Sequence, residues 1–208
     1  SRAAYLSYIA EKYFRPAHTL KQYFQMYGEA AHLYEIYNRY KEFNLDEWAQ
    51  MRKDKILEGR FVGGRVKYIL ADDASLFISA YRKEELSERE RLVLQYIKMH
   101  EGTDIEGIIR EMKWEREEIK RIVAKLDKHL YIARIFDIEN IWNARNLYTV
   151  LDDVKTVPNA RKTIVHRFIR NYGPVPLSAI RGYTAFDGAE VKEYVEELIE
   201  EGTVATLH

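Results

Sequence analysis

Cysteine is absent from the 208 residues of this chain, which also contains only 4 prolines and 10 glycines. Without cysteine, the chain cannot form disulfides, use a thiolate nucleophile or hold a metal through sulfur. No apolar run approaches the roughly 18 residues that a membrane-spanning helix needs, and residues 1–14 lack the apolar core of a secretory signal. These absences favour a cytoplasmic protein that does not contact a membrane.

An excess of either charge is also absent, because 33 lysines and arginines balance 33 aspartates and glutamates. A nucleic-acid-binding domain usually carries a basic excess, so any basic surface of this protein must be local. The six histidines lack the spacing of metal ligands, and no glycine-rich phosphate loop or serine elbow is present. We therefore expect no metal and no cofactor.

The second half of the chain contains an internal repeat. Residues 91–135 and 162–207 show the same order of apolar positions. Ile109 matches Ile180 at an offset of 71 residues, and after the next turn Leu126 matches Leu198 at an offset of 72. Both units are therefore expected to have the same order of elements, with three helices followed by at least one strand.

In the first unit, local signals mark the ends of the elements. Ser87 and Glu90 have the spacing of a capping box, and Asp104 can cap a second, short helix. A third helix with apolar positions at 3.6-residue spacing follows, and residues 131–137 and 146–151 alternate as strands. Three helices and a hairpin are the elements of a winged helix.

The second unit repeats this order. A first helix over residues 161–172 precedes a short helix over residues 177–183, and Asp187 caps a third helix that ends at Gly202. Residues 203–207 are expected to begin the wing. The sequence thus predicts a second winged helix whose hairpin is incomplete.

The N-terminal part contains helices over residues 5–14 and 20–40 and a third helix that begins at Asn44. A hairpin over residues 56–70 turns at a glycine pair, and a helix follows over residues 72–82. Helices followed by a hairpin are consistent with a third, diverged winged helix.

The predicted fold is mainly α with small β-hairpins, an α+β protein of tandem winged helices. Its predicted parts are an N-terminal region over residues 1–86, a winged helix over 87–158 and a winged helix over 159–208.

Two basic segments are candidates for binding DNA. In a helix-turn-helix the third helix lies in the major groove, and the third helix of the first unit carries cations outside its apolar stripe. The second candidate is the hairpin, where glycines at the tip allow close approach to a phosphate backbone but are also what a tight turn requires. The cations are Arg116, Lys120, Arg121, Lys125 and Lys128 in the helix, and Arg52, Lys53, Lys55, Arg60, Arg65 and Lys67 around the hairpin.

The third helix of the first unit has a second interpretation, because acidic residues stand among its cations and reduce its positive charge. Pairs such as Glu117 with Arg121 also occur on an ordinary solvated helix. Both interpretations remain open at this point.

The third helix of the second unit is acidic and carries a single lysine, Lys192. Phosphates would repel this helix, so it is expected to face away from nucleic acid or toward a protein partner. Its acidic residues are Glu190, Glu193, Glu196, Glu197, Glu200 and Glu201.

The order of these features resembles the winged-helix DNA glycosylases of the AlkZ type. That family has a glutamine-led motif followed at a spacing of fourteen by an arginine, and here Gln25-Met26-Tyr27 precedes Arg39. A helix over residues 45–51, the segment Gly63-Gly64-Arg65-Val66-Lys67 and two further winged helices follow in the family's order.

The resemblance implies excision of alkylated or crosslinked bases by hydrolysis of the N-glycosidic bond. It assigns a catalytic role to Gln25, while the second motif position holds Tyr27, a poor base, so that Glu29 would have to take its place. The hairpin histidine and arginine of the family are Lys67 and Gly63 here, and its C-terminal barrel has no counterpart up to His208.

Three functions follow for testing. The first is binding of double-stranded DNA through phosphates with low sequence specificity, in DNA repair or DNA metabolism. The second is a monofunctional DNA glycosylase that uses Gln25 and Glu29. The third is a protein-interaction module that uses the acidic final helix.

Overall fold

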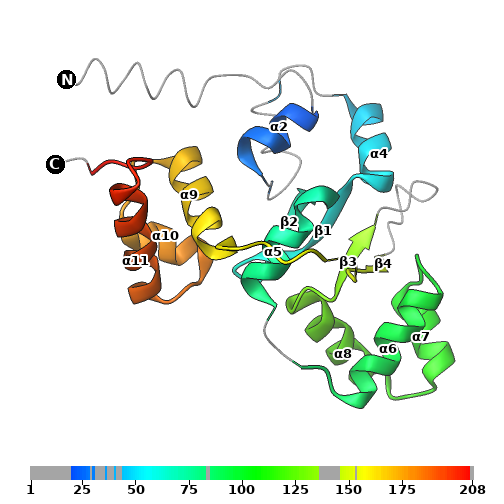
Figure 1. The fold of residues 1–208 in the computed structure, drawn as a ribbon. Coiled ribbons are helices and arrows are strands. Elements are labelled where there is room, and N and C mark those ends of the chain that lie inside the picture. Colours follow the sequence, from blue (N-terminus) through cyan, green and yellow to red (C-terminus); the bar gives the residue numbers. More distant parts are fainter. Residues whose placement is uncertain are drawn as a thin grey trace.

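The structure is a computed structural model that describes residues 20–28, 30, 36, 40, 44–82, 85–135, 146–152 and 154–206. The described part combines helices with one small antiparallel sheet of strand order β2-β1-β3-β4 (Figure 1). The protein is therefore α+β, as the sequence predicts. No helix in these ranges has both the length and the apolar character needed to cross a membrane.

The helix predicted over residues 20–40 ends at Tyr27, because Gly28 has a φ of +79° and Ala30 pairs with the sheet. The helix predicted over residues 5–14 lies outside the described residues.

The N-terminal region contains the predicted hairpin. Gly63 and Gly64 form its turn with φ values of +55° and +72°, which glycine adopts without steric cost. The helix predicted over residues 72–82 begins as a 3-10 turn. The elements are α2 (Leu20–Tyr27), α4 (Leu45–Asp54), β1 (Ile56–Val62), β2 (Arg65–Leu70), η1 (Ala71–Asp73) and α5 (Ala74–Tyr81).

The next elements are α6 (Glu88–Met99), α7 (Ile105–Met112), α8 (Arg116–Lys128), β3 (Ile132–Ile135) and β4 (Leu147–Val150). The predicted caps are confirmed. The Ser87 hydroxyl accepts from the Glu90 N–H while the Glu90 carboxylate accepts from the Ser87 N–H, and Asp104 accepts from the Gly107 N–H at 2.8 Å. These bonds satisfy N–H groups that have no partner within the helix.

The last helices are α9 (Ala160–Tyr172), α10 (Leu177–Thr184) and α11 (Gly188–Glu200). They repeat α6–α8 in backbone detail: Lys113 and Ala185, 72 residues apart, both end a short helix in the left-handed region, with φ of 54° and 58°. The buried residue equivalent to Ile180 is Ile108, so the match of Ile180 with Ile109 is wrong by one residue.

The wing expected over residues 203–207 is not observed in the described part. Residues 203–206 form no strand, and Leu207 lies outside the described residues. Asp187 caps α11 as predicted, accepting from the Ala189 N–H at 2.8 Å.

The sheet joins the N-terminal hairpin to the hairpin of the first unit, because β1 pairs with β3 through Glu58 and Arg134. Both outer strands are covered near their centres. Tyr68 of β2 exchanges backbone hydrogen bonds with Ala30, and Tyr148 of β4 is bridged to Thr103. The covered edges leave few backbone groups for pairing with another chain.

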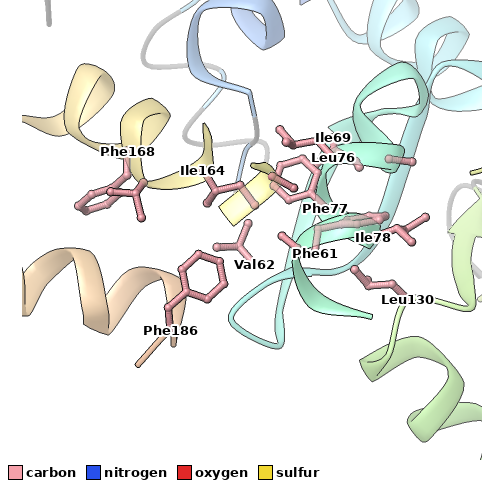
Figure 2. Packing of buried hydrophobic residues seen from close by; sticks show 14 of the residues in the cluster. Phe61, Val62, Ile69, Leu76, Phe77, Ile78, Leu130, Ile164, Phe168 and Phe186 are labelled. Atoms are coloured by element: carbon pink, nitrogen blue, oxygen red, sulfur yellow. The ribbon is translucent and has the colours of Figure 1, made fainter. Parts of the chain in front are cut away.

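The two repeated units bury their apolar faces differently. The first unit encloses its own core, with α6–α8 packed on β3 and β4. The second unit shares a core with the N-terminal hairpin and α5: Figure 2 shows Val62 of β1 between Ile164 of α9 and Phe186, while the Phe61 ring lies against Phe77 of α5. A further small core joins α2, α4 and Ile56.

Candidate nucleic-acid interface

Helix α8 has one buried face and one charged face. Its apolar face is buried in the core of the first unit. The exposed residues after Glu117 are Lys120, Arg121, Ala124 and Lys128, which we term the α8 row. From Lys120 onward, every exposed residue of this helix is thus a cation or an alanine.

The first cations of the α8 row are held only by weak bonds. Lys120 Nζ lies 2.7 Å from the Glu117 carboxylate, and Arg121 Nε donates to the Glu117 carbonyl at 3.4 Å. The two side chains of the Lys120–Glu117 pair are 44% and 74% exposed. An exposed pair of this kind contributes at most about 1 kcal/mol, so a phosphate can displace Glu117.

Arg116 and Lys125, also predicted to bind DNA, are directed toward other helices. The Arg116 guanidinium donates twice to Glu106 of α7, which raises the pKa of Arg116. The Lys125 ammonium lies 3.1 Å from Glu90, the carboxylate of the α6 capping box. Both side chains connect helices of the first unit and are not part of the α8 row.

The cationic cluster expected at the hairpin is dispersed in the structure. Arg52 is only 5% exposed, donates to Glu58 at 3.1 Å and lies 4.7 Å from the Tyr68 ring centre. Burial lowers the pKa of Arg52, against the opposing effect of Glu58. The prediction that Arg52 contacts phosphates is therefore wrong, because α4 directs this side chain into the protein.

Arg60 and Arg52 belong to one chain of ion pairs across the sheet. Arg134 donates to Glu58 at 3.1 Å and to Asp127 at 2.8 Å, and Arg60 Nε lies 3.4 Å from the same Asp127 oxygen. Asp127 is 4% exposed and belongs to α8. Arg60 thus shares Asp127 with Arg134, and the chain of pairs fixes α8 to the sheet.

The hairpin tip contacts α10 through Gly63, so this side of the turn is covered by protein. A β-carbon at Gly63 would stand 2.9 Å from the Tyr183 carbonyl oxygen. Arg65 and Lys67, which flank the tip, are directed toward the same turn of α10. Lys55 is exposed at the end of α4, whereas the Lys53 side chain lies outside what the structure describes.

The glycosylase residues receive little support. Gln25 belongs to α2 but its side chain is outside the described set, and Glu29 lies outside the described residues. Tyr27, at the second motif position, is 6% exposed, and its carbonyl accepts from Asn171 of α9 at 2.8 Å. This position faces packed protein rather than an open site.

Three acidic residues of the final helical segment are engaged with α9. Glu190 accepts from Arg161 through both oxygens, at 2.7 and 2.8 Å, and Lys162 donates to Glu197 and Glu201. The positions of α11 equivalent to the α8 row, 72 residues later, are Lys192, Glu193, Glu196 and Glu200. The outward face of α11 is therefore acidic where that of α8 is basic.

Comparison with models of protein families gives no match, and comparison with curated proteins gives none either. Within the ranges that the structure describes, no cluster of three histidine, aspartate or glutamate side chains could hold a metal ion. Any functional assignment therefore depends on the geometry of α8 and its surroundings.

The sequence anticipated Lys120, Arg121 and Lys128 as outward cations of α8, but nothing in it indicated the role of Arg134. The periodicity of one helix is sufficient to predict which of its residues face outward. The ion pairs of Arg134 could not be predicted from the sequence, because its partners are brought together only by the pairing of β1 with β3.

Proposed function

We propose that this protein is a DNA-binding protein of tandem winged helices, and that α8 holds double-stranded DNA through its phosphates. The order α6–α7–α8–β3–β4, with Thr103 bridged to Tyr148, supports the winged-helix assignment of the first unit. The third helix of such a unit enters the major groove. Its contacts would be largely independent of sequence, as expected for a protein of DNA repair or DNA metabolism.

The α8 row is the observation that carries this proposal. Lysine and arginine supply the charge-assisted contacts that dominate affinity for the DNA backbone. Ala124 stands between Arg121 and Lys128 on the exposed face, where its short side chain allows the helix to come close to the groove. The weak pairing of Lys120 means that little is lost when it turns to a phosphate.

The second unit supports the same proposal by contrast. It has three helices in the same order, yet its equivalent row contains Glu193, Glu196 and Glu200. A carboxylate facing a phosphate is repelled, so α11 is unsuited to DNA. Both units have the same order of helices and differ in the charge of the third helix. DNA binding is therefore assigned to the first unit on the basis of side-chain charge.

The test is fluorescence anisotropy of a labelled duplex across a salt series, with the full chain and a Lys120→Ala, Arg121→Ala, Lys128→Ala variant. Removing three cations that neutralise phosphates should weaken binding and reduce the slope of log K against log salt by up to about 3, at about 0.9 for each phosphate. A control variant, Lys21→Ala, Lys155→Ala, Lys192→Ala, removes three exposed cations elsewhere and should bind like the wild type. Equal affinities of the two variants would refute the proposal.

A further inference from the structure

The contact between the hairpin tip and α10 carries a group of cations of its own. Arg65 donates a hydrogen bond of 3.1 Å to the Gly182 carbonyl. The Lys67 ammonium lies 5.6 Å from the centre of the Tyr183 ring. The Gly182 carbonyl positions the Arg65 guanidinium without cancelling its charge, since a carbonyl carries no net charge.

Arg181 adds a third cation from α10. Its side chain is exposed and extends over the start of α11, where a β-carbon at Gly188 would lie 3.8 Å from Arg181 Cδ. The equivalent residue of the first unit, 72 positions earlier, is Ile109. This position of the short helix thus carries a cation only in the second unit.

A depression of about 770 Å³ lies beside these cations on the surface of α10. Gly182 leaves it open, because no atom lies within 4 Å of the point where a β-carbon would stand. One acidic residue lines it, Asp187, which accepts from the Ala189 N–H as the cap of α11. The lining residues are Ser178, Arg181, Gly182, Ala185, Phe186 and Asp187.

We propose that this surface, which we term the phosphate junction (Arg65, Ser178 and Arg181), binds phosphates of the DNA backbone as a second contact in addition to α8. The planar guanidinium groups match the geometry of a phosphate, and the exposed Ser178 hydroxyl is a further donor of the kind that binds phosphates. The two arginines of the junction outnumber the single carboxylate that lines the depression, Asp187. This inference rests on the proposed function, the binding of double-stranded DNA.

The junction gives the second unit a role in DNA binding that its acidic α11 cannot have. Its residues come from β2 and α10, which the packing of the hairpin tip on Tyr183 holds together. DNA would then be held at two places, by the third helix of the first unit and by the second helix of the second unit. Two contacts on one duplex raise affinity through effective concentration, without a new kind of interaction.

The experiment compares Arg65→Ala, Arg181→Ala with the α8 triple-alanine variant and with the combination of both, by anisotropy of a labelled duplex across a salt series. We expect the junction variant to bind more weakly and its salt slope to decrease by about 0.9 for each phosphate that is no longer neutralised. The α8 variant should retain a weak, salt-dependent binding that the combination removes. Lys155→Ala, Lys192→Ala is the matched control, with the same change in charge.

Arg181→Ala alone removes one positive charge and leaves the Arg65–Gly182 hydrogen bond intact. It therefore distinguishes the effect of lost charge on binding from the effect of weaker packing between the hairpin tip and α10. It should weaken binding by itself, and Arg65→Lys should weaken it less than Arg65→Ala. Wild-type affinity and slope in the junction variant would overturn this inference, while a loss confined to the α8 variant would leave the proposed function standing. A loss confined to the junction variant would overturn the proposed role of α8 and keep the junction.

Discussion

Gly63 and Gly64 are adjacent residues with similar backbones and different surroundings. Both have positive φ, but a β-carbon at Gly63 would meet the Tyr183 carbonyl of α10, whereas nothing lies within 4 Å of a β-carbon at Gly64. A substitution at Gly64 therefore tests only the preference of the turn for glycine, whereas a substitution at Gly63 also tests the contact with α10.

We expect Gly64→Ala to lower the free energy of unfolding by about 1–2 kcal/mol, the cost of a left-handed residue with a β-carbon. Gly63→Ala should lower it by about 1–3 kcal/mol more, since its methyl group also meets a backbone carbonyl that cannot rotate away. Urea denaturation of the two variants measures the difference. Equal losses would mean that the hairpin tip does not pack on α10 as observed.

At the scale of elements, local signals predicted most boundaries. The capping box at Ser87, the caps at Asp104 and Asp187 and the hairpin over residues 56–70 all depend on neighbours in the sequence, and all are observed. The placement of Arg52 depends on Glu58 and Tyr68 instead. Local composition shows a basic cluster there, but only the folded chain shows which cations are buried.

The α6 capping box gives a prediction about pH. Burial acts to raise the pKa of Glu90, but the Ser87 N–H and the Lys125 ammonium outweigh it and hold that pKa below its ordinary value of 4.5. Because the folded-state pKa is depressed, the stabilisation is present above the unfolded pKa and is lost as the pH falls through the folded pKa.

Glu90→Gln should therefore lower the free energy of unfolding by about 1 kcal/mol near neutral pH, and the difference from the wild type should shrink in acid below the ordinary glutamate pKa. Denaturation series at neutral and acid pH measure both values. Glu88→Gln, which changes an exposed residue of the same helical turn, is the control. A difference that stays constant with pH would contradict the assigned role of the Glu90 charge.

At the scale of the whole molecule, one repeated frame carries two opposite charge patterns. The first unit has its own core, and the second shares its core with β1, β2 and α5. The helical frame of both units was predictable from apolar periodicity. The shared core was not, since it joins residues as far apart as Val62 and Phe186.

The measurement that tests the central claim most directly exchanges the charge patterns. Arg121→Glu, Ala124→Glu, Lys128→Glu gives α8 the acidic residues of the equivalent α11 positions, and the reverse variant is Glu193→Arg, Glu196→Ala, Glu200→Lys. By anisotropy of a labelled duplex across a salt series, the first variant should lose most of its affinity, and the second should bind at least as tightly as the wild type. Wild-type binding by the acidic α8 variant would contradict the account.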